Sequence, residues 1–146
     1  MKSRLLIFAT LTLISFVVGC KSLTISVNET NPPVFSFSAG RFAECCTHLP
    51  FLTVSELPRE DSDARRPKII WEVRPLSGTD NSAEALPKIT YGQVPTGFEQ
   101  KIPAVGPPPA LEEGKIYQAS GPLIAVPEAD VRFRVQNGKV VPMLVP

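Results

Sequence analysis

VRFRVQNGKVVPML, residues 131–144, is the stretch that decides the fold. It contains two runs of alternating apolar residues separated by Asn137-Gly138, and a two-residue Asn-Gly loop is a strong hairpin signal because both residues tolerate positive φ. The predicted register pairs Gln136 with Lys139, Val135 with Val140 and Phe133 with Pro142. Since proline has no backbone N–H to donate, we predict that the second strand lies at a sheet edge.

The rest of the chain after residue 31 favours short strands. It holds all 16 prolines, and an interior proline removes a helical hydrogen bond and clashes with the preceding turn. Short apolar runs between turn residues predict seven to nine strands, the spacing of an all-β sandwich. The runs are 23–27, 34–37, 51–57, 69–73, 89–93, 98–102, 115–120, 131–136 and 140–144. The first of them reads either as a strand or as a tether.

Within 69–73, the alternation predicts that Ile69, Trp71 and Val73 share one face and that Glu72 lies on the other. Residues 56–68 contain many charged residues of both signs, which is typical of a solvated loop. Residues 103–109 are proline-rich and predict an extended polyproline II connector.

The N-terminus has the features of an export signal. Two basic residues, Lys2 and Arg4, precede an uncharged run from Leu5 to Val18 that is too short for a comfortable membrane span. The next residues complete the quartet Val17-Val18-Gly19-Cys20, which resembles the lipobox of bacterial lipoproteins. The small residue gives the lipoprotein signal peptidase access to the bond, and the thiol accepts a diacylglyceryl group.

This resemblance implies that the chain is cleaved between Gly19 and Cys20 and anchored in the bilayer by acyl chains on Cys20, with no other cofactor. Lys21 stands where aspartate would retain an enterobacterial lipoprotein in the inner membrane, which implies the outer membrane and a periplasm-facing domain. The expected organisation is a signal peptide over 1–19, a lipidated cysteine and short tether over 20–33, and one sandwich domain over 34–146.

A second resemblance lies in the C-terminal half. Leu111-Glu112-Glu113-Gly114-Lys115-Ile116-Tyr117 resembles the tyrosine corner of immunoglobulin-like and fibronectin type III domains, in which leucine caps the core, glycine bends the chain and the tyrosine hydroxyl bonds to backbone. Glu113 replaces the proline usual in fibronectin type III domains. The resemblance implies that Trp71 is the buried tryptophan of an early central strand. Such folds serve many roles and do not specify a function.

The adjacent residues Cys45 and Cys46 leave three alternatives open. They form a strained vicinal disulfide, they are two thiols on opposite faces of a strand, or they bond a partner chain. Together with His48, the only histidine, they also suggest a ligand or metal site. Zinc sites need wider ligand spacing, so we expect no metal here.

Composition and motifs favour a non-catalytic role. Without residues 1–19 the basic side chains fall from 15 to 13 against 14 acidic ones, so no basic field is present for nucleic acid. Gly-x-Ser-x-Gly and glycine-rich phosphate loops are absent from the sequence. We expect a binding or envelope-assembly module whose partner meets the edge strand ending in Pro142–Pro146 or the charged loop 56–68. The alternative is a ligand-binding or enzymatic lipoprotein with a site near Cys45, Cys46 and His48.

Overall fold

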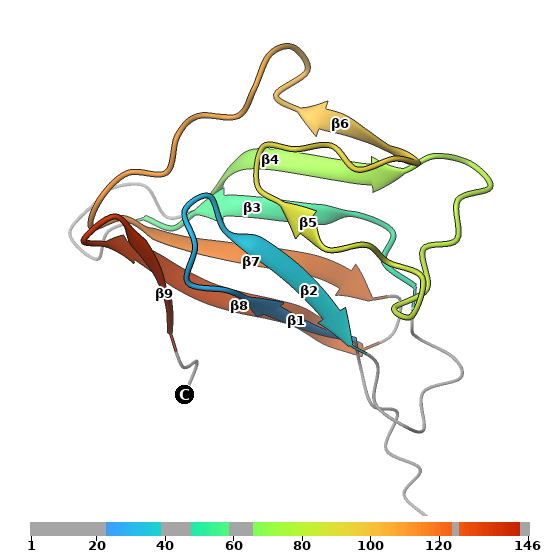
Figure 1. The fold of residues 1–146 in the computed structure, drawn as a ribbon, viewed down its shortest axis with the longest axis horizontal. Coiled ribbons are helices and arrows are strands. Elements are labelled where there is room, and N and C mark those ends of the chain that lie inside the picture. The colour runs from blue at the N-terminus through green and yellow to red at the C-terminus, as the bar shows by residue number, and fades with distance from the viewer. Residues whose placement is uncertain (1–22, 39–47, 59–65, 124–125, 144–146) are drawn as a thin grey trace, which may run out of the picture.

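The computed structural model describes residues 23–38, 48–58, 66–123 and 126–143. For residues 122–123 and 126–129 it describes the backbone alone. These residues form two antiparallel sheets that pack face to face, which confirms the predicted all-β sandwich (Figure 1). Within the described ranges, no helix has the length and apolar character needed to cross a membrane. The signal segment 1–19 and Cys20 lie outside these ranges.

The smaller sheet has three strands in the order β1-β2-β5. They are β1 (Thr24–Val27), β2 (Val34–Ser38) and β5 (Ile89–Thr90). Apolar residues that alternate along β1 and β2 turn inward, so that Ile25 is 5% exposed and Phe35 is fully buried. Residues 23–27 are therefore part of the sandwich, and the predicted boundary between tether and domain at residue 34 is wrong.

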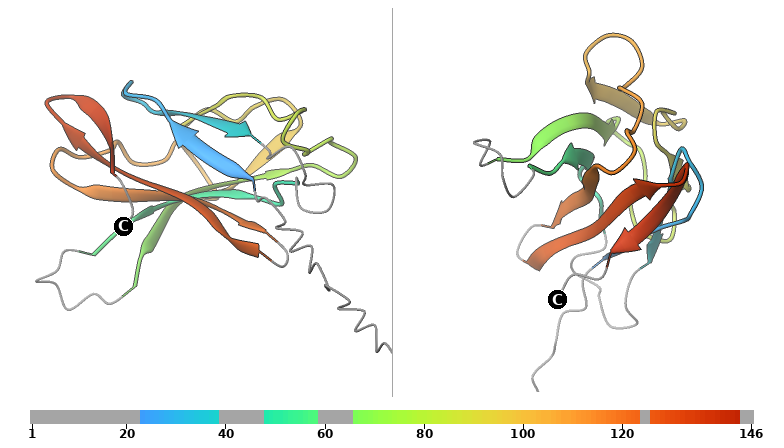
Figure 2. Two further views of the ribbon diagram at one scale, coloured as in Figure 1. Left: turned by 90° about the horizontal axis from the view of Figure 1, so that it is seen from below. Right: turned by 90° about the vertical axis from the view of Figure 1, so that its left-hand side faces the viewer.

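The larger sheet has six strands in the order β6-β4-β3-β7-β8-β9. They are β3 (Leu52–Glu56), β4 (Lys68–Pro75), β6 (Phe98–Ile102), β7 (Ile116–Leu123), β8 (Val126–Gln136) and β9 (Lys139–Met143). Figure 2 shows how the long β7 and β8 cross beneath the smaller sheet. The smaller sheet packs on one face of the larger sheet, and no other strand of the described residues packs on the opposite face.

The terminal hairpin forms with the predicted register. Gln136 pairs with Lys139, Val135 with Val140 and Phe133 with Pro142. Asn137 and Gly138 both have positive φ, 54° and 72°, as an Asn-Gly turn requires. Strand β9 lies at the edge of its sheet, as the proline predicted.

Aromatic residues dominate the core between the sheets. Trp71 and Phe133 are fully buried, and the ring of Phe133 lies 6.0 Å from that of Phe35 and 5.7 Å from that of Tyr117. Tyr91 meets Trp71 edge-on at 5.3 Å. Pairs of this kind contribute about 0.5–1.5 kcal/mol beyond the burial of their area. They join residues far apart in the sequence and fix how the two sheets pack.

Three predicted strands differ from the observed ones. The strand expected over 89–93 ends at Thr90 because Gly92, with φ 81°, turns the chain. The strand 98–102 pairs with β4 and not with the segment that precedes it in the chain. The strand expected to stop before Gly121 continues to Leu123, because β8 extends alongside it.

Candidate functional site

The open face of the six-stranded sheet contains a β-bulge that changes which residues it presents. In the pairing of β3 with β4, Val54 lies opposite Trp71, but Ser55 lies opposite Ile69, so one residue of β4 is skipped. Trp71 is therefore buried in the core, whereas Ile69 is 43% exposed on the open face. The prediction that Ile69 shares a face with Trp71 is wrong, because a bulge shifts the two-residue alternation by one.

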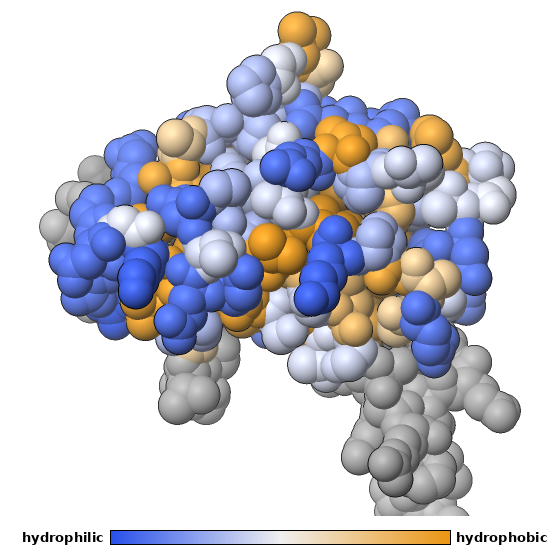
Figure 3. All heavy atoms as spheres, viewed as in Figure 1, coloured by the Kyte–Doolittle hydropathy of each residue, from blue (hydrophilic) through white to orange (hydrophobic). Residues whose placement is uncertain are grey.

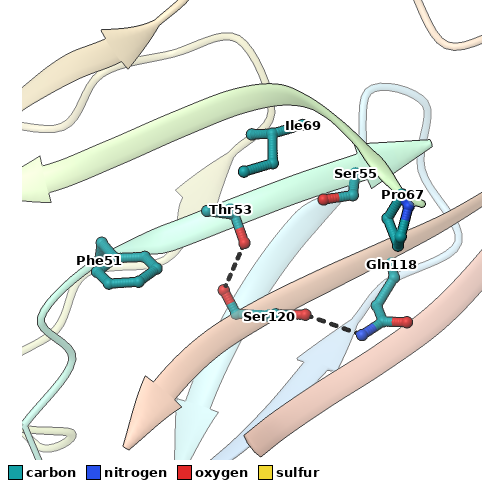
Figure 4. Close-up of a pocket in the computed structure, with 7 residues that line it drawn as sticks. All are labelled: Phe51, Thr53, Ser55, Pro67, Ile69, Gln118 and Ser120. Carbon is teal, nitrogen blue, oxygen red and sulfur yellow. Dashed lines mark hydrogen bonds between the residues drawn. The ribbon is translucent and has the colours of Figure 1, made fainter. Parts of the chain in front are cut away.

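A groove of about 310 Å³ lies on this face, over β3, β4 and β7 (Figure 4). Its floor carries hydroxyl and amide groups, and its rim carries apolar ones. The lining residues are Phe51, Thr53, Ser55, Pro67, Ile69, Gln118 and Ser120.

The polar floor is ordered by its own hydrogen bonds. The Thr53 hydroxyl donates to the carbonyl oxygen of Ser120 at 3.2 Å, and the Gln118 amide donates to the Ser120 hydroxyl at 3.1 Å. The other end of the Gln118 amide accepts from Arg132 Nε at 3.2 Å. The surface is thus held in one arrangement before any ligand arrives, which reduces the entropic cost of binding.

An ion pair supports the rim beside Phe51. Glu72 is only 6% exposed, and its carboxylate accepts a hydrogen bond from Arg74 Nε. The guanidinium of Arg74 lies 5.4 Å from the centre of the Phe51 ring, within the range of a cation–π contact. The pair compensates a carboxylate that is costly to bury alone and holds the aromatic ring at the end of the groove.

Both edges of the larger sheet are protected against strand addition. On β9, the Val140 N–H points away from β8 and donates to the Glu29 carbonyl at 3.3 Å. Pro142, two residues on, points the same way and has no N–H. The opposite edge strand β6 carries the ion pair Lys101–Glu99 at 2.7 Å. Charges and proline at an edge discourage pairing with another chain, so the described part of β9 is a poor partner site.

Two tyrosines hold the segment between β6 and β7. Tyr117 is 1% exposed, and its hydroxyl accepts a hydrogen bond from the Glu112 N–H at 2.9 Å, a contact to upstream backbone of the kind found in a tyrosine corner. The Tyr91 hydroxyl donates to the Pro109 carbonyl at 2.8 Å. Burial raises the pKa of both hydroxyls above the ordinary value. Both rings belong to the buried core.

The other residues of the predicted corner contribute to the turn itself. Leu111 packs against the core, and Gly114 has φ 76°. Glycine adopts this conformation at no steric cost because it has no Cβ, which explains its place in the motif.

Of the residues of the predicted alternative site, His48 lies among those that the structure describes. His48 is exposed and forms an isolated bridge with Ser82. Asp80 lies nearby, and its pKa is lowered chiefly by the hydrogen bond that its carboxylate accepts from the Ser82 N–H. Among the described residues no group of three metal-ligating side chains occurs, and His48 does not line the groove. Cys45 and Cys46 lie outside the described residues.

A second depression, of about 290 Å³, lies between the loop before β2 and the proline-rich connector. Its lining consists of Asn31, Pro32, Tyr91, Gly92, Pro107, Pro108, Pro109, Ala110 and Leu111. On the face of the molecule shown in Figure 3, hydrophilic and hydrophobic residues are interspersed. The depression itself carries few hydrogen-bonding side chains. The groove over β3, β4 and β7 is therefore the stronger candidate for a binding site.

Sequence reasoning missed the groove because it depends on the bulge and on the pairing of β3 with β7. The alternation of Thr53 and Ser55 with Leu52 and Val54 was the available signal, since it marks a strand with one polar face. Comparisons with protein-family models, with curated proteins and with solved structures found no match to this chain.

Proposed function

We propose that this chain is a bacterial lipoprotein, anchored through Cys20 in the outer membrane, whose sandwich acts as a non-catalytic binding or envelope-assembly module in the periplasm. The binding surface is the open face of the six-stranded sheet, centred on the groove. The observation that carries the binding role is that this face is left uncovered by the smaller sheet while its polar groups are already ordered.

The chemistry of the groove favours a neutral partner surface with both hydrogen-bonding and apolar groups. Its floor offers Ser55 and Gln118, while Phe51 and Ile69 provide apolar contact at the rim. The edge strands β9 and β6 are protected against pairing with another chain. We therefore propose that the partner contacts the open face of the sheet and not the last strand.

Metabolic labelling with a palmitate analogue tests the anchor. Wild type should be labelled, and Cys20→Ser should lose the label because the thioether and the acylated amino group both require that cysteine. The double variant Cys45→Ser/Cys46→Ser is the matched control and should keep the label. Persistent labelling of Cys20→Ser would show that the lipoprotein assignment is wrong.

Site-specific photocrosslinking in intact cells tests the binding face. A photoreactive amino acid at Ser55, in the groove, should yield a discrete crosslinked product. The same amino acid at Ser26, exposed on the outer side of the smaller sheet, is the matched control and should not. Equal products at both positions, or none at Ser55, would contradict the assignment of the face.

A further inference from the structure

Strand β1 begins unusually close to the proposed anchor. Leu23 is 1% exposed and packs in the core, and β1 starts at the next residue. Only Lys21 and Ser22 separate Leu23 from Cys20. An extended chain advances at most about 3.6 Å per residue, so the Cα atoms of Cys20 and Leu23 lie within about 11 Å of each other. A flexible tether of a dozen residues is therefore ruled out by the position of β1.

Contacts along β1 show which end of the sandwich it starts from. Near its beginning, Ile25 reaches Gly121 in β7, to within 3.4 Å of where a Cβ on that glycine would lie. Beyond its end, the carbonyl of Glu29 accepts from the N–H of Val140 in β9. Strand β1 thus runs from the end where β7 passes into β8 toward the end where β8 turns into β9, as Figure 2 also shows.

The turns at these two ends differ in charge. The stretch that carries the chain from β7 to β8, Gly121–Pro127, reads GPLIAVP and has no charged residue. At the other turn, the Glu113 carboxylate accepts from the N–H groups of Asn137 and Gly138. Lys115 bridges Glu112 at 2.7 Å and Glu56 at 2.9 Å close by. The loop between β4 and β5 adds Asp80 and Glu84 to the first end, so the contrast in charge applies to these two turns alone, and the short link from Cys20 carries the orientation.

We propose that the sandwich stands on the bilayer on the end that contains the start of β1 and the β7–β8 turn. This inference rests on the proposed lipidation of Cys20. The short link keeps this end against the lipid headgroups, and it holds the β8–β9 turn away from the membrane. Strand β8 has 11 residues, which at about 3.3 Å per residue separates the two turns by roughly 33 Å along the strand.

Fluorescence quenching by nitroxide-labelled phospholipids tests the orientation. The lipidated full chain, in the Cys45→Ser/Cys46→Ser background, is reconstituted into phosphatidylethanolamine/phosphatidylglycerol vesicles and labelled at one introduced cysteine. Glu84→Cys probes the membrane end, because the preceding Asn81 accepts from the Leu49 N–H beside Gly121. Lys139→Cys probes the opposite end. Both native residues are exposed.

We expect the label at position 84 to be quenched several-fold more than the label at position 139. Equal quenching at the two positions, or stronger quenching at 139, would overturn the orientation. Palmitate labelling of the same samples separates this failure from failure of the proposed function, which would leave the chain unlabelled and unbound to vesicles.

A linker variant tests whether the short link is the cause. Twelve Gly/Ser residues inserted between Lys21 and Ser22 span about 19 Å on average and release the domain from a fixed distance. The quenching ratio between positions 84 and 139 should then fall toward one while lipidation is retained. An unchanged ratio would show that the link does not set the orientation.

Discussion

The two faces of the six-stranded sheet share the same strands but differ in what fixes them. On β3, Leu52 and Val54 are fully buried against the smaller sheet, whereas Thr53 and Ser55 look outward over the groove. Inward residues are constrained by close packing, in which adding or removing even one methylene group disturbs the neighbouring side chains. On the outward face, hydrogen bonds order Thr53, Gln118 and Ser120. The comparison separates the residues that make the fold from those available for binding.

The bulge in β4 shows that a shift of one residue in the pairing decides on which face a side chain lies. Ile69 and Ile70 are chemically identical neighbours, yet Ile69 is 43% exposed and Ile70 only 6%. A single skipped residue in the pairing with β3 assigns one to the binding face and leaves the other buried. Composition alone does not distinguish the two faces at such a point.

The largest difference between the faces should appear at Phe133→Ala on β8. Phe133 is fully buried between Phe35 and Tyr117, so truncation leaves a cavity and should lower the free energy of unfolding by about 3–5 kcal/mol. Arg134→Ala, on the next and exposed residue, should change it by less than about 0.5 kcal/mol. Urea denaturation measures both, and comparable losses would contradict the assignment of faces.

Gly121→Ala should destabilise the buried face by overpacking. A Cβ there would overlap Leu49 Cδ1 and lie 3.4 Å from the Phe51 carbonyl oxygen. Because Leu49 is fully buried and has little room to move, we expect a loss of about 1–3 kcal/mol.

The double variant Gly121→Ala/Leu49→Ala checks this cause. Removing the Leu49 side chain makes room for the new methyl group, so the double variant should lose less stability than the two single variants added together. Strict additivity in urea denaturation would show that Leu49 is not the obstacle.

Tyr117→Phe removes a hydroxyl without opening a cavity. The Glu112 N–H then loses its acceptor, and we expect a loss of about 1–2 kcal/mol by thermal or urea denaturation. Tyr91→Phe is the matched comparison and should cost less, because an unsatisfied backbone carbonyl, such as that of Pro109, is tolerated more readily than an unsatisfied backbone N–H. The reverse order would indicate that the corner at Tyr117 is not the stronger contact.

The smallest effect on stability should come from Ile69→Ser, on the open face. We expect a change within about 0.5 kcal/mol in the free energy of unfolding, together with a lower crosslinking yield from position 55. Ile70→Ser, one residue along, should cost at least about 2 kcal/mol because its side chain is buried. If Ile69 proved the more costly of the two, the bulge would be misplaced.

Local sequence patterns predicted most of the strands. The Asn137-Gly138 turn fixed a register in which every later pair follows by counting, and Pro142 placed β9 at an edge. The pairing of β6 with β4 was not predictable in this way. Strand β5 lies between β4 and β6 in the sequence, so β6 has two candidate partners, β5 and β4. Which of them it pairs with depends on which sheet edge remains open after the smaller sheet forms.

The sequence by itself determined the fold class and the terminal hairpin, because turn chemistry and alternation act between residues close in the chain. It also pointed to Cys20 as an anchor, which remains a proposal. Tertiary structure decided that residues 24–27 form β1, that Ile69 faces outward and that the groove exists. Each of these depends on contacts between distant strands, and such contacts form only when whole sheet faces are buried against each other.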